Sequence, residues 1–407
     1  MALRPPIWSA SLLLLCSATT TVQAQTQTPD LVTLSAAYTL QTESNLYRLP
    51  ADANTQALLG TSSAAERIGI TSLGLAVNKA YSLQRFELNL NLVDYRYQNF
   101  DYLSFTARNY TGAWRWSLTP RLHGNLTAQR QETLNNFADY QGNSQRTQRN
   151  QRTDSANRFD AVYEMDGPWR ALAGVAQQKQ INQQALLADS DYSANSAQVG
   201  VLYVFASGSS LSYNLKGANG SYLNRSLSAA GLYDDAFDQL DTDLRLHWLI
   251  DGKTSVDLST SHISRTHPHF AQRDYSGLNA SANLSWSLSA KTALSAGWAR
   301  ELSSYQTSYS NYSQTDRFWL GPVWQLSPKA VLRLRYELAR RDYLGRAGTL
   351  AALQRNDTTR DASVSFDWQP YQRLTLSASL QYSQRNSSLP GLDYASNMAT
   401  ISAQYSY

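Results

Sequence analysis

The chain has 407 residues, a formal net charge of +4 and 42% hydrophobic residues. It is longer than the roughly 100–200 residues of an ordinary domain, which points to a large barrel or a repeat fold. Beyond the N-terminus, the sequence lacks the run of about 20 apolar residues that a membrane-spanning helix needs. It nevertheless holds 10 tryptophans and 25 tyrosines. Many aromatics in a polar chain fit a barrel whose strands are apolar on one face.

The N-terminus indicates export. Arg4 precedes a mostly apolar stretch from Ile7 to Ala18, and Val22-Gln23-Ala24 resembles a cleavage signal before Gln25. We therefore expect a signal peptide over residues 1–24 and one barrel over residues 25–407. Cleavage would remove Cys16, the single cysteine, so the mature chain would have no disulfide. A lipid anchor on Cys16 is disfavoured, because a bulky leucine precedes it.

Apolar and polar residues alternate along the chain, as in β-strands with one apolar and one polar face. The segments 85–92, 110–118, 243–250, 280–288 and 374–382 all show it. A helix would need apolar spacings of three and four, which these segments do not have. The side chains expected to line a hydrated lumen are Arg85, Glu87, Asn89, Asn91, Arg115, His123, Asp243, Arg245 and His247.

Two kinds of connection alternate strictly, as in outer-membrane barrels with short periplasmic turns and long outer loops. The expected long loops include 43–66, 133–156, 216–235, 303–316 and 341–360. The expected short turns lie at 79–80, 119–121, 166–168, 207–209, 251–253, 289–291, 327–329 and 369–370, where Gly, Pro, Asp and Ser favour turns.

Eight short turns give sixteen strands, and end strands at 31–42 and 395–407 raise the number to about 18, with 16–18 as the range. The fold class is therefore all-β: a transmembrane, antiparallel, up-and-down barrel. A propeller could share the repeat length near 40 residues, but its strands would be shorter. Aromatic side chains near the turns and the C-terminus are expected at the membrane interface, namely Trp114, Trp116, Trp248, Trp286, Trp324, Tyr405 and Tyr407.

The hydrocarbon of the membrane requires the sheet to close into a barrel. In hydrocarbon every backbone donor and acceptor must pair within the protein, and an open sheet edge would leave some unpaired. A barrel of about 18 strands is too wide for side chains to fill. The polar faces should therefore surround water.

Four segments together resemble the EpsL-type proteins of exopolysaccharide biosynthesis operons, within a wider group of outer-membrane β-barrel porins. They are 44–50 (SNLYRLP), 80–86 (AYSLQRF), 94–97 (DYRY) and 114–118 (WRWSL). Glu66-Arg67 departs from the Asp-Arg pair expected there. The resemblance implies a barrel working beside a polysaccharide synthesis and export apparatus, and it brings no catalytic motif.

Signals for catalysis or cofactors are weak. The sequence has neither a Gly-rich phosphate loop nor a nucleophile elbow, and we expect no catalytic, cofactor or metal residues. His267-Pro268-His269 is interpreted as an ordinary surface loop rather than a metal site. A hydrolase at the barrel rim is disfavoured. Cleavage would also remove Arg4, and a net charge of +3 (+4 minus one) on so long a mature chain predicts no nucleic-acid partner.

Two loops could touch carbohydrate or its anions. The segment 305–312 combines tyrosines with hydroxyls and amides, although a solvated loop is the simpler interpretation. The segment 145–158 carries Arg146, Arg149, Arg152 and Arg158, which could attract lipopolysaccharide or an acidic polymer. The expected partners are outer-membrane lipid and lipopolysaccharide, with exopolysaccharide and its export machinery as further candidates.

Three functions fit these patterns. The leading hypothesis is a hydrated channel or accessory barrel of polysaccharide secretion. The alternatives are a general diffusion porin and a non-conducting barrel that serves as a binding or structural platform.

Overall fold

A computed structural model describes residues 31–134, 137–139, 148–184, 190–229, 233–304, 310–345 and 355–407. The expected signal peptide, 1–24, lies outside them. Eighteen strands form one sheet. They are β1 (Val32–Glu43), β2 (Glu66–Tyr81), β3 (Gln84–Tyr97), β4 (Phe105–Thr119), β5 (Leu122–Leu134), β6 (Gln151–Glu164), β7 (Trp169–Asn182), β8 (Tyr192–Val204), β9 (Ser210–Tyr222), β10 (Ala236–Leu249), β11 (Thr254–Thr266), β12 (Tyr275–Ser287), β13 (Thr292–Ser304), β14 (Tyr312–Ser327), β15 (Ala330–Leu344), β16 (Asn356–Tyr371), β17 (Leu374–Ser387) and β18 (Tyr394–Ser406).

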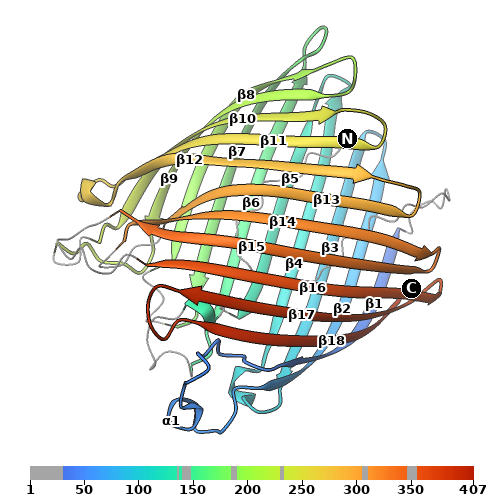
Figure 1. Cartoon of the computed structure of the whole chain (residues 1–407). Coiled ribbons are helices and arrows are strands. Elements are labelled where there is room, and N and C mark those ends of the chain that lie inside the picture. Colours follow the sequence, from blue (N-terminus) through green and yellow to red (C-terminus); the bar gives the residue numbers. More distant parts are fainter. Residues whose placement is uncertain are drawn as a thin grey trace.

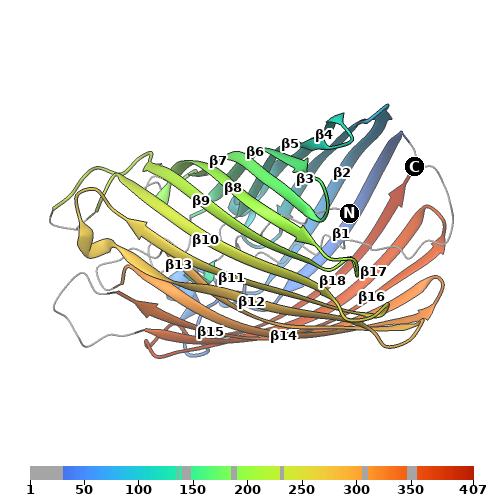
Figure 2. The same cartoon turned by 90° about the horizontal axis from the view of Figure 1, so that it is seen from above.

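Each strand pairs antiparallel with its neighbours in the chain, and β1 also pairs with β18, from Ser35–Ser406 to Glu43–Met398. The sheet therefore closes into a barrel without free edges, as a membrane-spanning sheet requires. The start of β1 and the C-terminus lie at the end of the barrel that carries the short turns, and α1 lies at the other end (Figure 1); Figure 2 shows the same barrel from above. The prediction of an up-and-down barrel of about 18 strands is confirmed.

Several predicted boundaries were wrong. Lys79-Ala80 lies within β2, whose ladder with β3 continues to Tyr81–Gln84, and the turn follows at 82–83. Gln369-Pro370 lies within β16, beside a register shift that lets proline avoid a ladder hydrogen bond. The predicted loops 133–156 and 216–235 overlap β6 and β9, because polar residues such as Arg152 and Lys216 continue these strands. Inward-facing polar residues therefore imitate loop composition.

The two faces of the wall differ as the alternation predicts. Residues directly opposite each other on neighbouring strands share a face, so the pairs Leu90–Tyr110 and Asn89–Thr111 identify one apolar and one polar face. Leu, Val, Ile and aromatic side chains stay exposed along the apolar face, which in water would be a large and costly patch. A closed barrel with an outward apolar band is an outer-membrane protein. Exposed side chains of this band include Leu73, Leu90, Val199, Leu244, Phe318, Leu380 and Ile401.

Short helices lie in the loops. They are α1 (Thr55–Leu59) and the 3-10 turns Asp101–Leu103, Phe137–Asp139 and Ala271–Arg273. Asn54 caps α1 by accepting a hydrogen bond from the backbone N–H of Ala57. Within the described ranges, no helix has the length and apolar character needed to cross a membrane.

Candidate functional site: the barrel lumen

The polar face encloses the lumen, and an ion-paired cluster on β3 and β4 shows how its charges are held. Glu87 lies between two arginines: its carboxylate oxygens are 2.9 Å from the Arg85 Nε atom and 2.9 Å from the Arg115 Nη2 atom. Arg85 and Arg115 are directly opposite each other across the ladder. Without Glu87 these like charges would repel each other, so the carboxylate is needed at this position.

The other predicted lumen residues lie on the same polar face. His123 contacts Glu164 at 3.2 Å, Arg245 contacts Asp243 at 3.4 Å and His247 contacts Asp257 at 2.6 Å. Asn89 and Asn91 are opposite Thr111 and Asn109 and are exposed. The structure therefore brings the predicted residues into local pairs around the wall rather than into one compact site.

Paired charges recur along the wall. Most pairs join residues two apart on one strand or opposite each other on neighbouring strands, which are the spacings that share a face. Such pairing leaves little unbalanced field within the pore. These pairs are Arg152–Asp154, Arg158–Asp160, Lys216–Asp241, Arg333–Asp367, Arg317–Glu337 and Arg335–Glu337.

One sector of the wall consists mainly of hydroxyl and amide side chains, and its charged inward-facing residues, Glu43 and Arg385, lie only at the end opposite the termini. We call it the hydroxyl track; it comprises inward-facing residues of β17, β18 and β1. Thr39 and Ser402 join their hydroxyls at 2.8 Å across the closing ladder, while Ser377 donates to Asp367 at 2.6 Å at the edge of the sector. The track offers donors and acceptors along much of the barrel's height. Its members are Ser35, Thr39, Gln41, Ser377, Ser379, Gln381, Ser383, Ser396, Thr400, Ser402 and Gln404.

Three outer loops fold onto the inner wall at the end opposite the termini. We call the loop residues 44–65, 98–104 and 137–139 the lid. Tyr47 is fully buried, with its ring centroid 4.8 Å from that of Phe100 and 4.6 Å from that of Phe137. Lid side chains cover the inner-face residues Ile68 and Val93, so this apolar core lies inside the barrel wall and narrows its mouth on one side.

Glu66, at the start of β2, anchors the lid. Its buried carboxylate accepts backbone hydrogen bonds from Gln98 at 3.1 Å, Asn99 at 2.9 Å and Phe100 at 2.7 Å. A carboxylate that accepts several N–H groups is held firmly. Glu66, where the sequence resemblance led us to expect an aspartate, is therefore central to the loop architecture.

The lid also reaches the hydroxyl-track strands. The Arg385 Nη1 group of β17 donates to the Ala138 carbonyl oxygen at 2.6 Å, and Asn45 donates to the Ala395 carbonyl oxygen at 3.0 Å. Arg48 pairs with Glu43, and its guanidinium carbon lies 5.5 Å from the Tyr394 ring centroid. The mouth is therefore bridged from β2–β5 to β17–β18, above the upper end of the track.

The predicted interface aromatics lie on the outer face, at the end with the short turns. Trp116 differs from the others: it is only 6% exposed, stacks on Phe159 at 5.5 Å and lies over Gly124, where no Cβ is in the way. Trp114, Trp248, Trp286, Trp324, Tyr405 and Tyr407 are exposed, with relative accessibilities from 39% to 64%.

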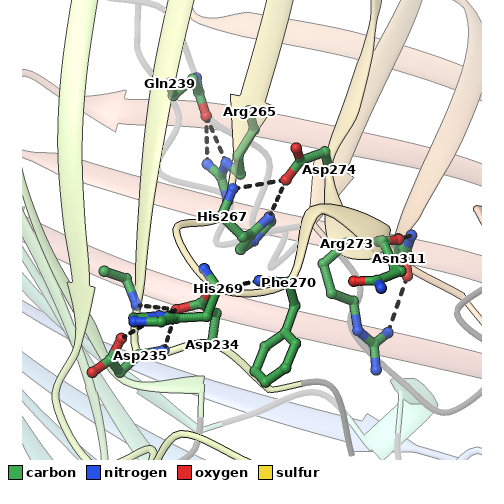
Figure 3. A network of polar contacts seen from close by, with 12 residues as sticks. Asp234, Asp235, Gln239, Arg265, His267, His269, Phe270, Arg273, Asp274 and Asn311 are labelled. Atoms are coloured by element: carbon green, nitrogen blue, oxygen red, sulfur yellow. Dashed lines mark hydrogen bonds and ion pairs between the residues drawn. The ribbon is translucent and has the colours of Figure 1, made fainter. Parts of the chain in front are cut away.

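On another side of the mouth, Figure 3 shows polar contacts among the loops after β9, β11 and β13. The interpretation of His267-Pro268-His269 as an ordinary surface loop was incomplete, because both histidines make specific bonds. The His267 side chain is buried with its Nδ1 atom 3.2 Å from Asp274, and His269 Nδ1 lies 3.0 Å from Asp234. The Arg273 Nη1 group donates to the Asn311 side-chain oxygen at 3.1 Å, linking a third loop.

The Asp234 carboxylate joins the loop after β9 to the loop after β11 by hydrogen bonds. Its carboxylate accepts from the backbone N–H groups of His269 at 2.7 Å and Phe270 at 3.1 Å. Asp234, Asp235 and His269 place three potential metal-ligand atoms within 4.8 Å of one another. The His269 and Phe270 N–H groups bond Oδ2 of Asp234, and the Asp235 N–H group bonds Oδ1 at 2.9 Å. Because backbone donors occupy both oxygens, the hydrogen bonds that join the loops explain this geometry.

The stability of this link between the loops should depend on pH. Burial favours a high pKa for Asp234, but the hydrogen bonds from His269, Phe270 and Ala236 outweigh it and hold the pKa at about 2. The bond to Asp234 raises the pKa of His269, with Asp235 3.8 Å away. Charged His269 therefore contributes stability below about pH 6.5, which is lost as the pH rises through its raised pKa; Asp234 contributes above about pH 4 and is lost as the pH falls toward 2.

We therefore expect residues 267–274 to exchange amide hydrogens more slowly at pH 5.5 than at pH 8.5, after correction for intrinsic rates. Hydrogen-exchange mass spectrometry of the folded barrel measures this. Asp234→Asn should raise exchange at both pH values and remove most of the difference. Equal protection of wild-type residues 267–274 at the two pH values would contradict the assignment.

The two loops with possible carbohydrate roles are only partly described. Arg146 and residues 305–309 lie outside the described residues. Arg152 and Arg158 belong to β6, where Asp154 and Asp160 neutralise them, so they do not form a basic outer loop. Arg149 donates to the Ser104 carbonyl oxygen at 2.8 Å and thus supports the lid.

Sequence reasoning missed the lid, its anchor Glu66 and the inward orientation of Trp319. The apolar run Phe318-Trp319-Leu320 hides the alternation at β14. The spacing Arg317-x-Trp319-x-Gly321 could have placed the tryptophan on the polar face. The lid gave no comparable signal, because it depends on contacts between separate loops.

Comparisons with known proteins agree with the barrel. A family model described as "Putative beta-barrel porin 2" matches residues 253–407, which include β11–β18. No curated protein matches the chain in sequence.

Solved structures with a similar fold come from Pseudomonas aeruginosa. OccK1 (OpdK) aligns with a TM-score of 0.51 at 10% identity, over 92% of this chain and 99% of that one. OccK2 (OpdF) in complex with glucuronate aligns at 0.50 and 13%, over 92% and 96%. OpdQ aligns at 0.50 and 12%, over 92% and 98%. At such identities, the similarity concerns the fold.

Proposed function

We propose that this protein is a channel through which an uncharged, hydroxyl-rich polymer crosses the outer membrane during exopolysaccharide secretion. The observation that carries the proposal is the hydroxyl track along β17, β18 and β1. A polymer rich in hydroxyls needs many exchangeable donors and acceptors, because it must give up and regain hydrogen bonds as it moves. Serine, threonine and glutamine side chains supply such partners.

The charges of the remaining wall support the same polymer class. Arginines such as Arg152 and Arg333 are neutralised by Asp154 and Asp367. A strongly anionic polymer would gain from unpaired cations and lose from the carboxylates. The resemblance to EpsL-type proteins adds a cellular setting, a polysaccharide synthesis and export apparatus.

A general diffusion porin is the second candidate. In its favour, a similar barrel has been solved with vanillate and another in complex with glucuronate, both small molecules. Paired wall charges also suit solutes of either sign.

Deletion of the gene, with separate measurement of surface and cell-retained polysaccharide, distinguishes the two candidates. Loss at the surface with accumulation inside supports export. Normal polymer in both fractions, together with slower uptake of small solutes, supports the porin. Loss of both fractions would point instead to a role in synthesis or its regulation and would contradict the channel proposal.

The paired wall also predicts weak ion selectivity. In planar bilayers under a salt gradient, the wild-type reversal potential should lie close to zero. Glu87→Gln should shift it toward anion selectivity, because Arg85 and Arg115 lose their shared partner. The ionic strength should stay near 0.1 M or lower, where the screening length is about 10 Å. Strong selectivity of the wild-type channel would contradict charge balance in the lumen.

A further inference from the structure

One tryptophan among the described residues faces the lumen. Trp319 of β14 is opposite Gly297 and Glu337 on the polar face, while its chain neighbours Phe318 and Leu320 are exposed on the apolar face. The tryptophans on the outward face are Trp114, Trp116, Trp169, Trp248, Trp286, Trp298, Trp324 and Trp368.

The indole lies flat on the wall near mid-height of the barrel. A Cβ atom on Gly297 would come within 2.2 Å of the Trp319 Cζ2 atom and 2.6 Å of Cε2. The absence of a side chain at position 297 therefore makes room for the ring. One ring face rests on the backbone of β13, and the side chain remains partly exposed to the lumen.

Charged groups surround this ring. The Arg335 guanidinium carbon lies over the indole ring, 5.9 Å from its centroid, and its Nη2 atom contacts a Glu337 oxygen at 2.8 Å. The Arg317 Nε atom lies 3.0 Å from the other Glu337 oxygen. Arg335 is 43% exposed, so it can still reach a ligand. The indole and the charged hydrogen-bonding groups near it therefore form a surface that is partly apolar and partly polar. This surface is comparable in size to one sugar ring.

We infer that Trp319 is a saccharide subsite within the lumen, at which one pyranose ring stacks on the indole. Arg335 and Glu337 bond the ring hydroxyls, and their mutual pairing favours an uncharged sugar over a uronic acid. This inference deepens the proposed function and rests on it for the polymer. The subsite adds one defined binding position to the polymer's route through the lumen, along which the hydroxyl track offers many similar contacts.

The ring also covers a glycine in a sheet, which is a stabilising arrangement in its own right. Trp116 does the same over Gly124 on the outer face. The positions differ in what lies beyond the ring: Trp116 is buried beside Phe159, whereas Trp319 borders the lumen and three charged groups. Glycine cover explains the ring's position, and its lumen-facing polar border indicates a ligand.

Single-channel recording in planar bilayers tests the subsite with maltohexaose, an uncharged saccharide. We expect reversible current blocks in the wild-type protein. In Trp319→Ala the blocking affinity should fall by about tenfold or more, because the apolar contact of a ring face is lost. Trp319→Phe should retain part of the affinity. Trigalacturonate should block less well than maltohexaose; a reverse order would overturn the assignment of an uncharged sugar.

Trp298→Ala is the matched control, since Trp298 is on the neighbouring strand and faces outward, toward Phe318. It should lower stability without changing the block. An open channel with identical blocks in wild type and Trp319→Ala would overturn the subsite and leave the channel intact. If the wild type does not conduct, calorimetric binding of maltohexaose to detergent-solubilised protein decides. Binding that depends on Trp319 then supports the subsite while refuting the channel, and absence of binding refutes both.

Discussion

Replacing Tyr47 by alanine should open the barrel mouth. Tyr47 is fully buried between Phe100 and Phe137, and its hydroxyl bonds to that of Tyr102. Removing so large a buried aromatic typically costs about 3–5 kcal/mol. Strand pairing does not depend on this side chain, so the loss should fall on the lid. We expect an intact barrel, faster hydrogen exchange over residues 44–65 and a higher single-channel conductance.

Tyr47→Phe is the control, because it keeps the ring packing and removes only the hydroxyl. One hydrogen bond contributes about 0.5–1.5 kcal/mol, so lid exchange should rise slightly and conductance should stay near the wild-type value. Faster exchange in Tyr47→Ala at unchanged conductance would show that the lid does not limit flow. Unchanged exchange would show that other contacts, such as Glu66 with residues 98–100, hold the lid alone.

An arginine on the lipid face should destabilise the barrel far more than one on the lumen face. Leu90 and Asn89 are consecutive residues near the middle of β3 and point to opposite faces. For Leu90→Arg we expect a loss of about 2–4 kcal/mol in the free energy of unfolding, the range for Arg or Lys at the bilayer midplane. Asn89→Arg should cost little, because the lumen hydrates the guanidinium.

Urea unfolding in lipid vesicles measures both variants, and the heat-modifiable band in gel electrophoresis reports the assembled fraction. Leu88→Ala is a further control, since it shortens a lipid-facing side chain without adding charge. Equal losses for Leu90→Arg and Asn89→Arg would mean that the two faces have similar surroundings. That result would contradict the assignment of lipid outside and water inside.

The class of fold could be predicted because its cause is local. Alternation such as Phe86-Glu87-Leu88-Asn89-Leu90 requires only that side chains point alternately to lipid and water. Turn positions were predictable where Gly and Pro together interrupt the pattern, as at Asp166-Gly167-Pro168. At Lys79-Ala80 and Gln369-Pro370 the local signal was misleading, because ladder pairing with the neighbouring strand continues past these residues.

The sequence predicted which side chains face the lumen, but not which side chains they contact there. The sequence places Glu87 on the polar face, and its position between Arg85 and Arg115 depends on the register between β3 and β4. A shift of one residue would turn every side chain to the other face. The two histidines of the 267–269 segment likewise have partners, Asp274 and Asp234, that sequence distance does not reveal.

By itself, the sequence determined the barrel, its approximate strand number and which side chains meet lipid or water, because a two-residue period and a closed hydrogen-bond ladder are enough to require them. Only the tertiary structure decided that the lid folds inward, that Glu66 anchors it and that Trp319 lies over Gly297 facing the lumen. These features depend on contacts between residues far apart in the chain. Such contacts depend on the register that the closed sheet sets among all eighteen strands.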